Sequence, residues 1–152
     1  MFLGRRRELP TLRKVLTRPR AALAIIYGRR RVGKSTLLRH AVHGAPHIYY
    51  QATRVADADS QALFKGEIAR SIGADPVLEG LAGWEPILSY LHQVARTRIK
   101  GLAVILDEFP YLCESNPAIP SILQKVWDAV TRSGAHLKLV LCGSRISFME
   151  VA

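Results

Sequence analysis

The stretch Gly28-Arg29-Arg30-Arg31-Val32-Gly33-Lys34-Ser35 (GRRRVGKS) matches the pattern G-x-x-x-x-G-K-[ST] at every fixed position. The apolar run that precedes it, Leu23–Tyr27, is typical of a buried β-strand. The residues that follow it, Thr36–Val42, predict a helix. Because this pattern needs a strand before it and a helix after it, the stretch predicts a strand–loop–helix unit of an α/β domain.

The spacing of this stretch suits the binding of a phosphate chain. Glycines such as Gly28 and Gly33 let the main chain curl closely around an anion, so that backbone N–H groups point at it. The helix that follows adds its free N–H groups and the positive end of its dipole. We expect Lys34 to reach the β- and γ-phosphates and the Ser35 hydroxyl to bind Mg²⁺. The predicted nucleotide-binding residues are Gly28, Arg29, Arg30, Arg31, Val32, Gly33, Lys34, Ser35 and Thr36.

Composition is that of one globular domain. The chain has 152 residues, of which 49% are hydrophobic and 22% charged, which is enough to bury a core. No apolar run approaches the length of a transmembrane helix, and the N-terminus lacks the features of a signal peptide. The two cysteines, Cys113 and Cys142, are too few for a disulfide framework. We therefore expect a cytoplasmic protein.

Positive charge is concentrated in the first third of the chain. Thirteen of the 22 Lys and Arg residues lie in residues 1–54, together with one acid, Glu8. Nucleotide phosphates account for part of this excess, and it leaves a nucleic-acid partner open. The alternative is a solvated basic face without a partner.

The rest of the chain alternates strand and helix patterns. Further strands are predicted at His47–Gln51, Leu102–Leu106 and Leu137–Cys142. Helices are predicted over residues 60–72, from Pro86 and from Pro120, with 75–83 as a loop. This alternation predicts a parallel sheet with right-handed crossovers, whose ligands bind at the carboxyl ends of the strands.

An acidic pair follows the third predicted strand. Asp107 and Glu108 come directly after the apolar run Leu102–Leu106, which is the arrangement of a Walker B motif. Asp107 would hold Mg²⁺ or a water bound to it, and Glu108 would activate the attacking water. The alternatives are a strand-end cap for Asp107 and a solvated loop acid for Glu108.

Taken in order, these motifs resemble the P-loop ATPases of the AAA+ superfamily. More narrowly, the chain resembles a prokaryotic, largely archaeal ATPase family that opens with F-x-G-R-x-x-E-L. The residues that match are Phe2, Gly4, Arg5, Glu8 and Leu9, then Gly28–Ser35, Leu102–Pro110 (LAVILDEFP) and Leu139–Glu150 (LVLCGSRISFME).

This resemblance implies further features. Phe2–Arg5 would lie near the adenine, and Ser144 would be the sensor 1 group that contacts the γ-phosphate or the water. The fold would be a three-layer P-loop sandwich with strand order 5-1-4-3-2. Residues 1–152 would then be the N-terminal part of one domain, with a fifth strand and a helical lid lying beyond Ala152. The resemblance also allows for assembly into an oligomer, or for an effector domain in chain beyond Ala152.

The function expected from the motifs and the resemblance is Mg²⁺-dependent hydrolysis of ATP, with ATP and Mg²⁺ as cofactors. Its catalytic residues would be Lys34, Glu108 and Ser144, and its metal ligands Ser35 and Asp107. Two alternatives remain open. One is a nucleotide-operated switch with little turnover, coupled to a DNA-binding or effector domain. The other is a small-molecule kinase, which the Asp-Glu pair and the F-x-G-R opening disfavour.

Overall fold

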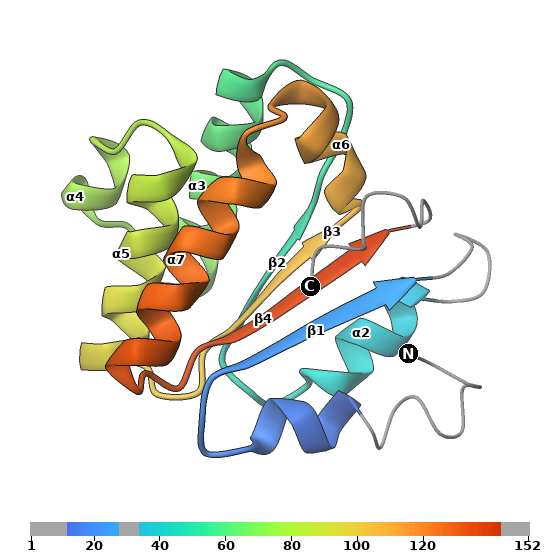
Figure 1. The fold of residues 1–152 in the computed structure, drawn as a ribbon, viewed down its shortest axis with the longest axis vertical. Coiled ribbons are helices and arrows are strands. Elements are labelled where there is room, and N and C mark those ends of the chain that lie inside the picture. Colours follow the sequence, from blue (N-terminus) through green and yellow to red (C-terminus); the bar gives the residue numbers. More distant parts are fainter. Residues whose placement is uncertain (1–11, 28–33, 144–152) are drawn as a thin grey trace.

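Four parallel strands form the centre of the molecule in this computed structural model, which describes residues 12–27 and 34–143. The strands are β1 (Ala22–Tyr27), β2 (His47–Gln51), β3 (Ala103–Asp107) and β4 (Lys138–Gly143). They are hydrogen-bonded in the order β1-β4-β3-β2 (Figure 1). The predicted α/β class and parallel sheet are confirmed, and the order agrees with the 1-4-3-2 part of the expected sheet. The fifth strand of that expectation stays a prediction.

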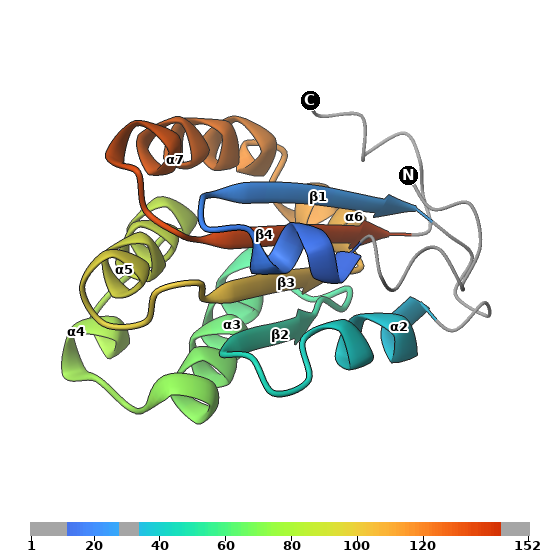
Figure 2. The same ribbon diagram turned by 90° about the horizontal axis from the view of Figure 1, so that it is seen from below.

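Helices cover both faces of the sheet and make three layers. On one face lie α3 (Asp57–Ile72), α5 (Trp84–Thr97) and α7 (Ile119–Ser133). On the other lie α2 (Lys34–Ala41) and a short helix at residues 12–17 (Figures 1 and 2). Two further helices, α4 (Pro76–Glu79) and α6 (Phe109–Ser115), lie at the margins. Such a sandwich follows from strands that are apolar on both sides, because each face of the sheet must be buried.

The two faces of the sheet have separate apolar cores. The larger core joins alternate strand residues such as Tyr50, Val104 and Leu139 to helices α3, α5, α6 and α7. The smaller core takes the intervening strand residues and packs them against α2 and the helix at residues 12–17; it contains Leu12, Ile26, Leu38, Ala41, Val42, Tyr49, Ala103, Ile105, Val140 and Cys142. Period-two alternation along each strand therefore decides which helix layer a side chain contacts.

A buried lysine fixes the segment that leads into β1. Lys138 begins β4 and is 1% exposed, and its ammonium donates hydrogen bonds to the backbone carbonyls of Arg18 and Arg20. These carbonyls come just after the helix at residues 12–17, where free carbonyls need donors. Burial lowers the pKa of Lys138, and the nearby charges of Arg20 and Arg18 lower it further.

Helix boundaries needed several corrections. Helix α3 begins at Asp57 rather than at residue 60, and α5 begins at Trp84, two residues before Pro86. The segment 75–83 was predicted as a loop, but residues 76–79 form α4. The Asp75 carboxylate caps the first turn of this helix by accepting a hydrogen bond from Val77 N–H at 3.0 Å.

Among the described residues, no helix has both the length and the apolar character that crossing a membrane requires.

Candidate functional site

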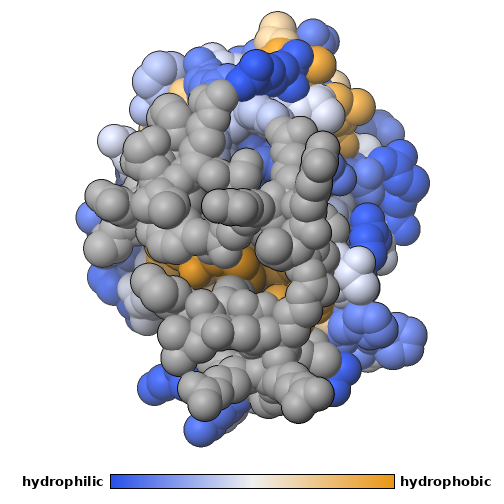
Figure 3. Space-filling view, turned by 90° about the vertical axis from the view of Figure 1, so that its right-hand side faces the viewer, coloured by the Kyte–Doolittle hydropathy of each residue, from blue (hydrophilic) through white to orange (hydrophobic). Residues whose placement is uncertain are grey.

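The strands end together at one edge of the sheet. Tyr27 of β1 is paired with Gly143 of β4, and Gln51 of β2 with Asp107 of β3. Figure 3 looks onto the side of the molecule toward which these strands run, and of the described residues seen there, hydrophilic ones lie around the rim and a small apolar strip lies nearer the centre. In parallel sheets this is the edge at which ligands bind. It is also where the sequence predicted the acidic pair.

The structure describes only part of the predicted site. Gly28, Arg29, Arg30, Arg31, Val32, Gly33 and Ser144 lie outside the described residues, as do residues 1–11. Lys34 and Ser35 form the first turn of α2, and their side chains are outside the description. Thr36 lies exposed in the same turn. The phosphate loop therefore remains a prediction from the sequence, framed by β1, which ends at Tyr27, and by α2, which begins at Lys34.

Asp107 is the best-defined polar group of the site. It is the last residue of β3 and is 1% exposed. Its Oδ2 accepts a hydrogen bond from the Tyr49 hydroxyl, and its Oδ1 accepts one from the backbone N–H of Glu108 at 2.9 Å. These two bonds, one to each oxygen, fix the orientation of the carboxylate, and carboxylate oxygens are ligands that Mg²⁺ prefers.

Glu108 has an unusual backbone conformation. It is the one described non-glycine residue with a positive φ, at φ 54° and ψ 41°, and it is 5% exposed. Side chains adopt this left-handed region at a cost of about 1 kcal/mol, and such residues cluster at functional sites. The conformation turns the chain sharply from β3 into α6, and the Glu108 carbonyl accepts the Tyr111 N–H at 3.0 Å. Pro110 stands in the first turn of that helix, which the sequence analysis did not predict.

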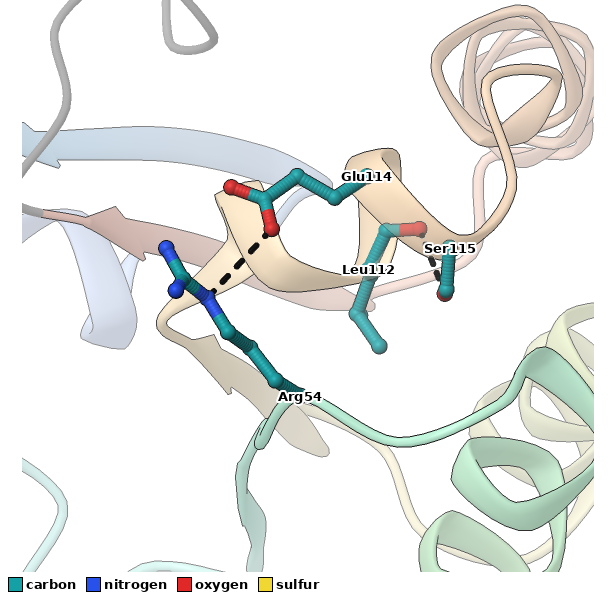
Figure 4. A network of polar contacts seen from close by, with 4 residues as sticks. All are labelled: Arg54, Leu112, Glu114 and Ser115. Carbon is teal, nitrogen blue, oxygen red and sulfur yellow. Dashed lines mark hydrogen bonds and ion pairs between the residues drawn. The ribbon is translucent and has the colours of Figure 1, made fainter.

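The helix that follows Glu108 is tied to the loop after β2. Figure 4 shows Arg54 extending from that loop toward Glu114 of α6, with Nε and Oε1 3.5 Å apart. The Arg54 guanidinium also lies over the Tyr111 ring, 4.9 Å from its centre. In the same helix the Ser115 hydroxyl donates to the Leu112 carbonyl at 3.0 Å (Figure 4). These contacts support the turn that presents Glu108, although the exposed ion pair itself contributes little stability.

Tyr49 was missed by the sequence analysis. It lies in the middle of β2, where the alternation shows only that Tyr49 and Tyr50 face opposite sides of the sheet. Its contact with Asp107 depends on the β2–β3 register, which places Tyr49 opposite Ile105 and Gln51 opposite Asp107. No signal in a single sequence specifies that register.

The residues present fit a magnesium ion. Mg²⁺ prefers hard oxygen ligands and is usually held by one or two protein oxygens, substrate phosphates and waters. Asp107 supplies a carboxylate oriented by hydrogen bonds, and Ser35 adds a hydroxyl by its residue type. In the described part of the chain no three His, Cys, Asp or Glu residues are grouped into a metal cluster.

A basic surface lies beside the site on the α2 face. Arg13 donates from its guanidinium to the His40 carbonyl at 3.2 Å and so joins the helix at residues 12–17 to α2. Thr36, Arg39, His40 and His43 line an open cavity of about 270 Å³ on α2. The predicted excess of positive charge is therefore partly gathered on one side of the described molecule.

Comparison with known proteins identifies a family. Residues 2–151 match the model of an ATPase domain family described as predominantly from Archaea. A curated relative, an uncharacterized protein of Methanocaldococcus jannaschii, is 33% identical over 150 residues, which is 98% of this chain and 31% of the relative.

Solved structures have the same fold. The Walker-type ATPase PABY2304 of Pyrococcus abyssi matches with a TM-score of 0.66 and 22% identity, over 94% of this chain and 45% of its own. The ORC2 protein of Aeropyrum pernix, solved as ADPNP–ADP complexes, matches with a TM-score of 0.66 and 22% identity, over 96% and 42%. The chain thus spans about a third of the curated relative and less than half of these two structures.

Proposed function

Because this chain belongs to the family of ATPase domains found predominantly in Archaea, we propose that it binds ATP with Mg²⁺ and hydrolyses it to ADP and phosphate. The observation that carries this proposal is the buried Asp107, oriented by two hydrogen bonds at the ligand-binding edge of the sheet and followed by Glu108. The Aeropyrum ORC2 protein, which has the same fold, was solved as ADPNP–ADP complexes, and this supports the proposal that the present chain binds a nucleotide.

Each residue has a separate role in the proposed reaction. Lys34 and the amides of Gly28–Ser35 neutralise the phosphate charge that grows in the transition state. Ser35 and Asp107 would hold Mg²⁺, which when bound offsets charge on the β- and γ-phosphates. Glu108 accepts a proton from the attacking water, or orients it, and Ser144 contacts the γ-phosphate or that water. Glu108 is 5% exposed and directly follows Asp107 in the chain, which is where this role requires it.

The variant Glu108→Gln tests the hydrolytic step. It keeps the size of the side chain and removes the base, so ATP should still bind while hydrolysis falls by about two orders of magnitude. Steady-state phosphate release measures turnover, and titration calorimetry measures binding. Glu79→Gln is the matched control, because Glu79 is an exposed residue of α4.

Hydrolysis by Glu108→Gln at the parent rate would exclude Glu108 as the water activator. ATP binding without measurable turnover in the parent protein would instead favour a nucleotide-operated switch.

A second candidate function is nucleic-acid binding by the basic surface. The contact between Arg13 and α2, with Arg39, His40 and His43 nearby, favours it. Each phosphate contact releases counterions, so binding to DNA should weaken steeply as salt is added. Fluorescence anisotropy with a labelled duplex measures this. Arg13→Gln should weaken binding, whereas Arg132→Gln, on α7 at the opposite face, should not. Absence of binding at low salt would leave a solvated basic face.

A further inference from the structure

The hydrogen bond between Tyr49 and Asp107 joins two strands at the proposed metal site. Tyr49 pairs with Ile105, and Asp107 lies two residues further along β3, on the same face of the sheet. Diagonal neighbours of this kind lie within reach of a long aromatic side chain. The Tyr49 hydroxyl therefore reaches Oδ2 from the side, while the Glu108 N–H holds Oδ1. Tyr49 is 9% exposed, so little water competes for this bond.

A cation lies over the same ring. The Arg39 guanidinium is 4.4 Å from the centre of the Tyr49 ring. Such a cation is attracted to the face of the aromatic ring and keeps the ring in place. Its positive charge also stabilises the negative charge that develops on the phenol oxygen as the hydroxyl donates, which makes the hydroxyl a stronger donor to a carboxylate. Arg39 belongs to α2, the helix that begins with Lys34 and Ser35. The three side chains thus connect the helix of the phosphate loop to the carboxylate at the end of β3.

We propose that Tyr49, held under Arg39, is a positioning residue that orients the Asp107 carboxylate for Mg²⁺ in the nucleotide complex. This inference rests on the proposed function. A carboxylate that is free to rotate must be ordered when the cation arrives, whereas one held at both oxygens is already ordered. Loss of the phenol hydroxyl should therefore weaken the contribution of Mg²⁺ to nucleotide binding. It should leave binding without Mg²⁺ unchanged, because Tyr49 is assigned no contact with the nucleotide.

The test uses Tyr49→Phe, which keeps the ring and removes the hydroxyl. Titration calorimetry with the non-hydrolysable analogue ADPNP, in EDTA and at a series of Mg²⁺ concentrations, gives the Mg²⁺ needed for half-maximal tightening. We expect that concentration to rise about tenfold, the scale of losing one hydrogen bond to a charged group. Tyr50→Phe is the matched control. Tyr50 is the next residue, is 3% exposed and packs against Phe64 in the opposite core.

The outcomes separate this inference from the proposed function. If the parent protein shows no Mg²⁺-dependent binding of ADPNP, the proposed function fails and the inference fails with it. If the parent shows it and Tyr49→Phe needs the same Mg²⁺ concentration, only the inference is overturned. A lower melting temperature with unchanged Mg²⁺ dependence would assign Tyr49 a merely structural role and also overturn it.

Arg39→Met gives a second, independent variant. Arg39 is exposed, so its replacement leaves the core intact even if Tyr49→Phe fails to fold. We expect a rise of about threefold in the required Mg²⁺ concentration, the scale of an exposed cation–π contact. Arg132→Met, an exposed residue at the end of α7, is its control. An Arg39→Met protein with the parent's Mg²⁺ dependence would contradict the role assigned to Arg39, and would overturn the proposal where Tyr49→Phe cannot be measured.

Discussion

Lys34 is the residue whose replacement tests the phosphate loop most directly. It occupies the lysine position of the GRRRVGKS stretch and begins α2. Lys34→Ala removes the cation expected to face the β- and γ-phosphates, so affinity for MgATP should fall by about tenfold or more. Titration calorimetry measures this, with the exposed Lys100→Ala as a control for loss of one positive charge. Unchanged affinity in Lys34→Ala would contradict the assignment of the phosphate loop.

Single residues differ in how far the sequence could predict their roles. Asp107 and Glu108 could be placed at a strand end because the apolar run before them is unmistakable, and β3 does end at Asp107. The left-handed backbone of Glu108 could not be predicted, because it depends on how α6 packs after the strand. Tyr49 could not be assigned either, because its role depends on which strand lies beside β2 and in which register.

At the level of the helix, two glycines should respond oppositely to the same substitution. Gly134 ends α7 with φ 74°, a left-handed conformation that side chains rarely adopt. Gly66 lies inside α3, where an added Cβ would meet only the Arg70 side chain at 3.8 Å. Gly134→Ala should therefore lower the free energy of unfolding by about 1 kcal/mol, and Gly66→Ala should raise it by about 0.5–1 kcal/mol. Urea unfolding of both variants measures the difference, and a shift of the same sign in both would contradict this account.

Elements with a strong apolar pattern were predicted well, and short elements were not. The predicted bounds of β2, His47–Gln51, agree with the structure, β1 begins one residue earlier than predicted, and β3 and β4 are each shifted by one residue at both ends. The helices α4 and α6 were missed. Neither has enough turns to show a periodic face. The Asp75 cap helps to stabilise α4, and α6 is positioned by contacts with distant parts of the chain, such as that between Arg54 and Tyr111, which a sequence does not display.

At the scale of the whole molecule, the order of the sheet leaves β1 at an edge. The alternation of strands and helices predicted a parallel sheet but not its order, which came from the family resemblance. Leu23 and Ile25 of β1 are only partly buried against the larger core, whereas every residue of β3 and β4 is buried. Beside them an apolar hollow of about 90 Å³ is lined by Leu23, Pro120, Leu123, Gln124, Trp127, Asp128, Leu139 and Leu141.

This edge leads to a prediction about the 152-residue chain. An apolar edge strand offers unpaired backbone groups and apolar side chains to other molecules, so the chain should self-associate as its concentration rises. Sedimentation velocity across a concentration series measures this. Leu23→Lys should reduce the association, because a charge on an edge strand opposes pairing. Leu63→Lys is the matched control, since Leu63 is 49% exposed on α3, a helix that packs beside β2 at the other edge of the sheet.

We further propose that residues 1–152 are part of one ATP-binding domain, in which additional chain supplies a fifth strand beside β1 and a lid over the nucleotide. A longer chain that supplies both should be monodisperse, more stable to urea and faster in phosphate release than residues 1–152 alone, because the edge is then paired and the nucleotide is shielded from water. Equal stability, monodispersity and turnover in the two chains, or a 152-residue chain that stays monomeric at every concentration, would contradict the role given to this edge.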